Sequence, residues 1–111
     1  MIKVVNKKTY DGPGEYVGRP SPLGNPFPIS IGRRECIEKF RDWLYGQERT
    51  SAAWQEVSRL VRLYKAQGYL VLICWCAPLA CHADVIAEAV LEIVESGEKE
   101  PERGLPSHLE P

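Results

Sequence analysis

An unbroken apolar segment, residues 69–75 (Tyr-Leu-Val-Leu-Ile-Cys-Trp), lies between Gly68 and Pro78. An apolar run bounded by such chain breakers is typical of a central strand that is buried on both faces. Strands of this kind belong to parallel sheets, which are covered by helices. The segment therefore predicts an α/β fold.

Apolar residues at helical spacing predict three helices around this strand. The first is expected over residues 33–45, and the second follows a serine N-cap and covers residues 52–67. The third is expected to begin at Cys81 or His82 and to close at Gly97, where a glycine favours a helix end.

Two shorter strands are predicted nearer the N-terminus, over residues 2–5 and 16–17. The order of strands and helices predicts a small, three-layer, Rossmann-like domain over residues 1–97, with a short and mostly parallel sheet flanked by helices. A chain of 111 residues suits one such domain. Residues 98–111 hold three prolines and four glutamates and are expected to form a polar tail.

Charge and hydropathy argue against several kinds of partner. The chain has 14 Lys and Arg residues against 15 Asp and Glu residues, and a net charge of −1 does not favour a protein that wraps nucleic acid or lies on an acidic membrane. No apolar run approaches the roughly 18 to 20 residues that span a bilayer, and the first residues show no signal-peptide pattern. We therefore expect a cytoplasmic protein with no membrane partner, whose charge balance suits a small anionic ligand.

A loop rich in proline and glycine covers residues 18–28 and is a candidate ligand-binding element. Its four prolines exclude a helix or a central strand and hold the loop in one shape. Its glycines let a backbone approach a ligand closely, and its arginine suits a phosphate or carboxylate. At the start of the next helix, an anionic ligand or a surface carboxylate would offset the unfavourable interaction of two arginines with the helix dipole. The candidate ligand-binding residues are Gly18, Arg19, Ser21, Gly24, Asn25 and Arg34. The alternative is a rigid structural turn with a solvated arginine.

Three cysteines and a histidine gather where the predicted central strand ends. Cys74 and Cys76 are two positions apart, so both sulfurs could face one site. Cys81 and His82 follow at the start of the next helix, where free N–H groups and the helix dipole favour a thiolate. These features predict a lowered pKa for the Cys81 thiol.

The residues alone leave three interpretations of this segment open. Thiolates and an imidazole are zinc ligands, so Cys74, Cys76, Cys81 and His82 form a candidate metal set, although the C-x-C-x₄-C-H spacing departs from common zinc modules. Alternatively, Cys81 is a catalytic nucleophile with His82 as its base. In the third interpretation the cysteines are small core residues and the histidine is hydrogen-bonded to the loop.

Both segments are expected at the same edge of the sheet, because ligands of such folds bind outside the carboxyl ends of the strands. Cys36 lies on the apolar face of the first helix and is expected to pack in the core. Trp75 is the tryptophan that could border the site, since the other two lie on apolar helix faces.

The two segments together resemble an uncharacterised family of bacterial and tailed-phage proteins that is catalogued as a domain of unknown function. Members carry I-G-R-x-S-x-x-G-N-P-F and C-W-C-x-P-x-x-C-H elements. This chain has Y-V-G-R-P-S-P-L-G-N-P-F at residues 16–27 and C-W-C-A-P-L-A-C-H-A-D-V at residues 74–85. The resemblance covers roughly residues 1–96, and the phage association implies a role in nucleotide or nucleic-acid metabolism.

The cysteine-rich segment is also similar to a second uncharacterised bacterial family, in which a strand ends in L-L-C-x-E and a helix begins with C-H-R. That similarity implies a Rossmann-like arrangement in which a strand-end cysteine faces a helix-start Cys-His pair. This chain has Cys76 where that family has glutamate and Ala83 where it has arginine, so those two roles do not carry over. Three hypotheses follow: a domain or enzyme that binds a nucleotide or other phosphate-bearing ligand, a zinc-binding module for proteins or single-stranded nucleic acid, and a structural accessory domain.

Overall fold

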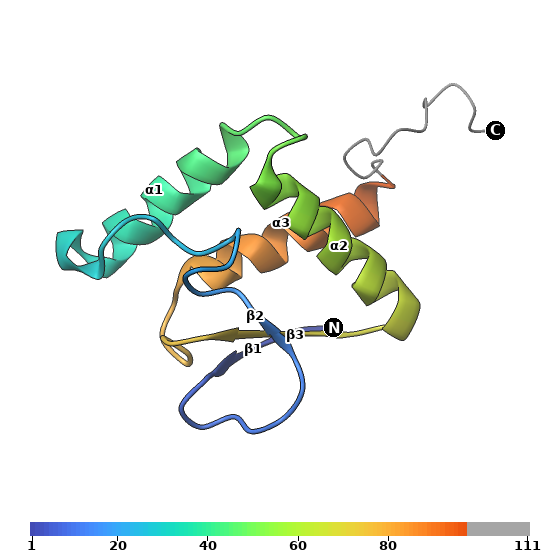
Figure 1. Ribbon diagram of the computed structural model, residues 1–111, viewed down its shortest axis with the longest axis horizontal. Coiled ribbons are helices and arrows are strands. Elements are labelled where there is room, and N and C mark those ends of the chain that lie inside the picture. The colour runs from blue at the N-terminus through green and yellow to red at the C-terminus, as the bar shows by residue number, and fades with distance from the viewer. Residues whose placement is uncertain (98–111) are drawn as a thin grey trace.

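The computed structural model describes residues 1–97 and shows three strands, three α-helices and one short 3₁₀ helix (Figure 1). The elements are β1 (Ile2–Asn6), β2 (Glu15–Tyr16), η1 (Ile29–Ile31), α1 (Arg33–Tyr45), α2 (Ala52–Gln67), β3 (Leu70–Cys74) and α3 (His82–Ser96). The predicted polar tail, residues 98–111, lies outside the described residues. Within residues 1–97, no helix combines the length and apolarity that crossing a membrane requires.

The three strands form a parallel sheet in the order β1-β3-β2, so the predicted central strand is confirmed. Asn6 at the end of β1 pairs with Cys74 at the end of β3, and Tyr16 at the end of β2 pairs with Ile73. The carboxyl ends of all three strands therefore meet at one edge of the sheet. The loops that follow β2 and β3 both leave from that edge.

The three α-helices lie on one face of the sheet, and the segment between β1 and β2 crosses the other (Figure 1). Leu70, Leu72 and Cys74 alternate along β3 and are buried beneath the helices. On the opposite face, a Cβ atom added at Gly14 would lie 3.0 Å from Ile73 Cδ1. The expected α/β class is confirmed, but the expected third layer is wrong, because the short turn-forming segment between β1 and β2 supplies no helix for that face.

Local sequence signals account for the helix ends. The Ser51 hydroxyl accepts a hydrogen bond from the Trp54 N–H (3.3 Å), as the predicted N-cap of α2. Gly68 ends that helix with φ +84°, in the left-handed region that favours glycine. Cys81 is the N-cap of α3, and its N–H donates to Asp84 Oδ2 (3.1 Å). This cap fixes where the cysteine–histidine pair meets the sheet edge.

One hydrophobic core between the sheet and the helices supports this edge. The helices bring their apolar faces together over β3, as their spacing predicted. The largest fully buried side chains of this core include Phe40, Leu44, Trp54, Leu60, Leu72 and Ile86. Cys36, on the buried face of α1, is buried as expected, but it lies beside the pocket and Asn25 rather than within this cluster.

Candidate functional site

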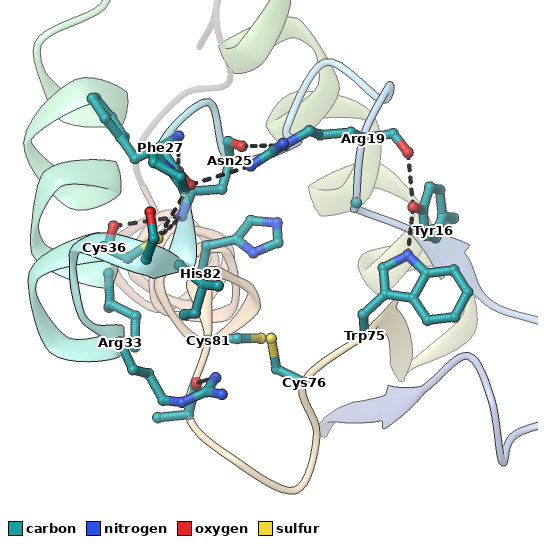
Figure 2. Close-up of a pocket in the computed structure, with 16 residues that line it drawn as sticks. Tyr16, Arg19, Asn25, Phe27, Arg33, Cys36, Trp75, Cys76, Cys81 and His82 are labelled. Carbon is teal, nitrogen blue, oxygen red and sulfur yellow. Dashed lines mark hydrogen bonds between the residues drawn. The ribbon is translucent and has the colours of Figure 1, made fainter.

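A pocket of about 540 Å³ opens at the carboxyl edge of the sheet (Figure 2). The loop after β2, the start of α1 and the loop between β3 and α3 form its walls. The structure thus brings together the two segments that were expected at this edge. The lining residues are Tyr16, Gly18, Arg19, Asn25, Phe27, Pro28, Ile29, Ser30, Arg33, Cys36, Ile37, Trp75, Cys76, Ala80, Cys81 and His82.

The pocket has a positive charge balance in a chain whose net charge is −1. Its described lining contains the guanidinium groups of Arg19 and Arg33 and no Asp or Glu. Within residues 1–97, neither guanidinium forms an ion pair with a carboxylate. In this view the two groups lie on either side of the His82 ring (Figure 2). The described pocket lining therefore carries two positive charges and no negative one.

Arg19 is held in place by main-chain carbonyl groups of its own loop. Its Nε donates to the Asn25 carbonyl oxygen (2.7 Å), and its Nη2 donates to the Phe27 carbonyl oxygen (3.2 Å). The guanidinium group has five N–H donors, so these two bonds leave three for other acceptors. The predicted ligand-binding arginine of this loop therefore lines the pocket with donors to spare.

Arg33, rather than the expected Arg34, contributes the second guanidinium. Arg33 Nη1 donates to the Ala80 carbonyl oxygen (2.9 Å), whereas Arg34 is exposed and does not line the pocket. Successive helix residues point about 100° apart, so only one of the two can face the site. Arg33 is three residues before buried Cys36 and four before Ile37, and this spacing was a signal in the sequence that could have identified it.

The remaining predicted loop residues shape the loop more than they line the pocket. Ser21 and Gly24 are not in its lining: the Ser21 hydroxyl accepts from the Leu23 N–H (3.2 Å). A Cβ added at Gly24 would lie 2.9 Å from Arg19 Cα, so glycine lets this part of the loop fold back closely. Gly18 lines the pocket, and a Cβ there would collide with the Tyr16 side chain.

Asn25 is buried and ties the loop to α1. Its Oδ1 accepts from the Phe27 N–H (2.9 Å), and its Nδ2 donates to Cys36 Sγ (3.1 Å). These bonds fix the side-chain amide and orient the two carbonyl groups that hold Arg19. Asn25 thus borders the pocket mainly as a positioning residue.

An aromatic pair, Tyr16 and Trp75, forms the wall opposite α1 (Figure 2). Trp75 Nε1 donates to the Tyr16 hydroxyl (2.9 Å), which itself donates to the Arg19 carbonyl oxygen (2.7 Å). The Trp75 side chain is nevertheless 49% exposed. The sequence interpretation considered Trp75 for the site edge but missed Tyr16, which had no signal beyond its place in a short predicted strand.

The three cysteines of the second segment differ in their surroundings. The Cys81 thiol donates to Cys74 Sγ (3.4 Å), and both residues are buried. Cys74 faces the helices and is absent from the pocket lining, whereas Cys76 and Cys81 line it and point toward each other (Figure 2). Both thiols therefore approach Cys81, that of Cys74 from the core and that of Cys76 from the pocket.

The Cys81 thiol has a pKa raised above its usual range, the opposite of the expected direction. Burial is the largest cause, and the neighbouring thiols of Cys74 and Cys76 add to it. The Ala83 N–H at the start of α3 lowers this pKa, as the helix terminus was expected to do, but by less. Burial thus outweighs the helix terminus and keeps the thiol protonated at neutral pH.

His82 is nine-tenths buried and is fixed on two sides. Its Nε2 lies 2.8 Å from the Val17 carbonyl oxygen, and its ring packs edge-on against Phe40 at a centroid distance of 5.0 Å. Burial lowers the pKa of His82, and the nearby Arg19 guanidinium lowers it further. The imidazole is therefore neutral at pH 7.

The family model described as a domain of unknown function, DUF4326, matches residues 2–92 of the chain. The chain belongs to this family. Every residue that lines the pocket falls within the DUF4326 match. No curated protein and no solved structure matches the chain. The expectation that the chain belongs to an uncharacterised domain family is thereby confirmed.

The DUF4326 fold does not arrange the four candidate metal ligands as one set. Among residues 1–97, no group of three His, Cys, Asp or Glu side chains is placed to hold a metal ion. Cys81 is engaged with Cys74, and the Nε2 atom of His82 is engaged with a backbone carbonyl. The histidine contact with the loop is the one that the packing interpretation anticipated.

Proposed function

We propose that this DUF4326 domain binds a small ligand that carries a phosphate group, such as a nucleotide. The observation that carries the proposal is the pair of guanidinium groups, each anchored by main-chain carbonyls, at a pocket whose described lining has no carboxylate. Guanidinium donors match the oxygen atoms of a phosphate in both charge and geometry. An anion would complete the hydrogen bonding of both groups.

Other arginines of the chain show the contrast. Arg41 pairs with Glu88 at 2.7 Å, and Arg59 pairs with Glu15 at 2.6 Å. Arg41 and Arg59 meet carboxylates supplied by the fold, whereas Arg19 and Arg33 meet only carbonyl oxygens in the described part of the chain. A carbonyl oxygen positions a guanidinium group without neutralising its charge, so the attraction for an external anion remains.

The rest of the pocket supports a ligand with a flat ring. Its volume of about 540 Å³ suits a small molecule rather than a duplex. Tyr16 and Trp75 offer aromatic surface beside the arginines, and stacking of a nucleobase on an aromatic side chain contributes about 1 to 3 kcal/mol. A nucleotide would place its phosphate against the arginines and its base against the aromatic side chains.

Calorimetric titration with inorganic phosphate and with a ribonucleoside 5′-monophosphate tests the proposal. Arg33→Ala removes a pocket guanidinium, and Arg34→Ala is a matched control because the neighbouring arginine is exposed and outside the lining. We expect binding by the natural chain, a loss of about tenfold or more with Arg33→Ala, and little change with Arg34→Ala. Equal effects of the two substitutions, or no binding of either probe, would overturn the proposal.

A further inference from the structure

The hydrogen bond between His82 and Val17 determines which ring nitrogen carries the proton. A carbonyl oxygen can only accept, so the 2.8 Å contact requires a proton on Nε2. Val17 is itself held in place, because its N–H donates to the Ile73 carbonyl oxygen (3.0 Å) of the central strand. In a neutral imidazole, the other nitrogen, Nδ1, is then an unprotonated acceptor.

Nδ1 of His82 opens into the pocket. It has no hydrogen-bond partner in the described part of the chain, although the residue is only 9% exposed. Among residues 1–97, no fully buried side-chain nitrogen or oxygen lacks a partner, so this atom must reach solvent. The pocket is the open space that His82 lines. The site thus contains a nearly buried side chain with an unused acceptor.

His82 Nδ1 is the nearly buried side-chain acceptor of the pocket; the Ser30 hydroxyl also lines the pocket, but it is exposed and can donate as well as accept. Arg19 and Arg33 can only donate. Asn25 Oδ1 already accepts from Phe27, and the Tyr16 hydroxyl already accepts from Trp75. A phosphate oxygen carries lone pairs and would be repelled by the lone pair of Nδ1. The ligand group that contacts this nitrogen must therefore be a donor.

We propose that His82 Nδ1 accepts a hydrogen bond from a hydroxyl group of the ligand, and that this contact selects phosphate esters of hydroxylated compounds over phosphate alone. The inference rests on the proposed function and narrows its ligand class. Ribonucleotides and sugar phosphates carry such a hydroxyl near their phosphate. Arg19 and Arg33 would hold the phosphate, and His82 would recognise the sugar between it and the aromatic wall.

The tautomer of His82 can be tested without any ligand. Nitrogen-15 NMR of the imidazole groups distinguishes protonated from unprotonated ring nitrogens, and the signal that disappears in His82→Gln belongs to this residue rather than to His108. We expect Nε2 protonated and Nδ1 unprotonated at pH 7. Protonation of Nδ1 instead would overturn the inference while leaving phosphate binding by the arginines untouched.

A matched pair of nucleotides tests whether the chain prefers a phosphate ester that carries hydroxyl groups. The probes are a ribonucleoside 5′-monophosphate and its 2′,3′-dideoxy counterpart, with inorganic phosphate as a third. We expect the natural chain to bind the ribonucleotide about tenfold more tightly than the dideoxy form, because the latter leaves Nδ1 unpaired. His82→Gln keeps an amide donor for the Val17 carbonyl but places no acceptor at the position of Nδ1, so we expect it to bind both nucleotides alike.

The outcomes separate this inference from the proposed function. If His82→Gln retains the full preference for the ribonucleotide, or the natural chain shows none, the hydroxyl contact is wrong and the phosphate site stands. If neither nucleotide nor phosphate binds, the proposed function fails and this inference fails with it. His82→Asn is the second variant: it restores an acceptor near the Nδ1 position, and a partial recovery of the preference would support the assignment.

Discussion

Arg33 Nη1 donates to the Ala80 carbonyl oxygen at 2.9 Å, across 47 positions of the chain. This contact ties the first turn of α1 to the loop that runs from β3 to α3. That loop carries Trp75 and Cys76 on the pocket wall and leads into Cys81 and His82. The Arg33 side chain therefore lines the pocket and also joins two of the elements that surround it.

Arg33→Ala should loosen the β3–α3 loop even in the absence of ligand. The Leu79 N–H is bonded to the Cys76 carbonyl oxygen (2.9 Å) inside this loop, and local opening frees it for exchange. We expect faster amide hydrogen exchange over residues 76–80 in this variant, measured by mass spectrometry. Arg34→Ala should leave exchange unchanged, and faster exchange in both variants would instead indicate a general weakening of α1.

Gly24→Ala should destabilise the loop that holds Arg19. The added methyl group would lie 2.9 Å from Arg19 Cα and 3.0 Å from Arg19 N, both backbone atoms that cannot rotate away. We expect the free energy of unfolding in urea to fall by about 1 to 3 kcal/mol. Gly12→Ala is the control, because its new methyl group would meet the Tyr10 ring, which can turn aside. Equal losses in the two variants would contradict this explanation.

The sequence predicted the helices and the central strand well because the signals for these elements are local. The bounds of α1 and α2 follow from apolar spacing, and the caps at Ser51 and Gly68 act over a few residues. The central strand is recognisable from its continuous apolar run. Placement of both loops at one sheet edge then follows from parallel topology. The missing third layer was not foreseen because apolar spacing predicts three helices but does not reveal which face of the sheet each helix covers.

The site was less predictable because its chemistry depends on orientation and burial. Arg33 and Arg34 are adjacent in sequence, and only the rotation of α1 decides which one enters the pocket. The loop composition indicated that Ser21 and Gly24 could bind, yet the turn directs them into the loop itself. The pKa of Cys81 is set by a tertiary environment that residue type and helix position do not reveal.

Cys76 should react with alkylating agents before Cys81 at neutral pH. The thiolate is the reactive form, and burial raises the pKa of Cys81, whereas Cys76 is partly exposed at the pocket. Iodoacetamide labelling followed by peptide mass mapping measures the order. We expect Cys81 to be modified appreciably only in alkaline solution, with Cys36 and Cys74 slow because both are buried. Preferential labelling of Cys81 at pH 7 would revive the nucleophile interpretation.

His82 should make the stability of the fold depend on pH in the mildly acidic range. Its pKa is lowered in the folded state from the ordinary value of 6.5, so the unfolded chain binds more protons between the two values. The stabilisation is present in full above about pH 6.5 and is lost as the pH falls toward the folded pKa. The urea midpoint should accordingly decline below pH 6.5 in the natural chain.

The same titration in His82→Gln isolates this contribution. Glutamine does not titrate, so carboxylates alone would govern the acidic limb of its stability curve, and they act mostly at lower pH. We expect the difference in unfolding free energy between the natural chain and the variant to shrink steadily from pH 7 toward pH 5. A difference that stays constant over this interval would mean that the ring is not held neutral. The acceptor at Nδ1 would then have to be reassigned.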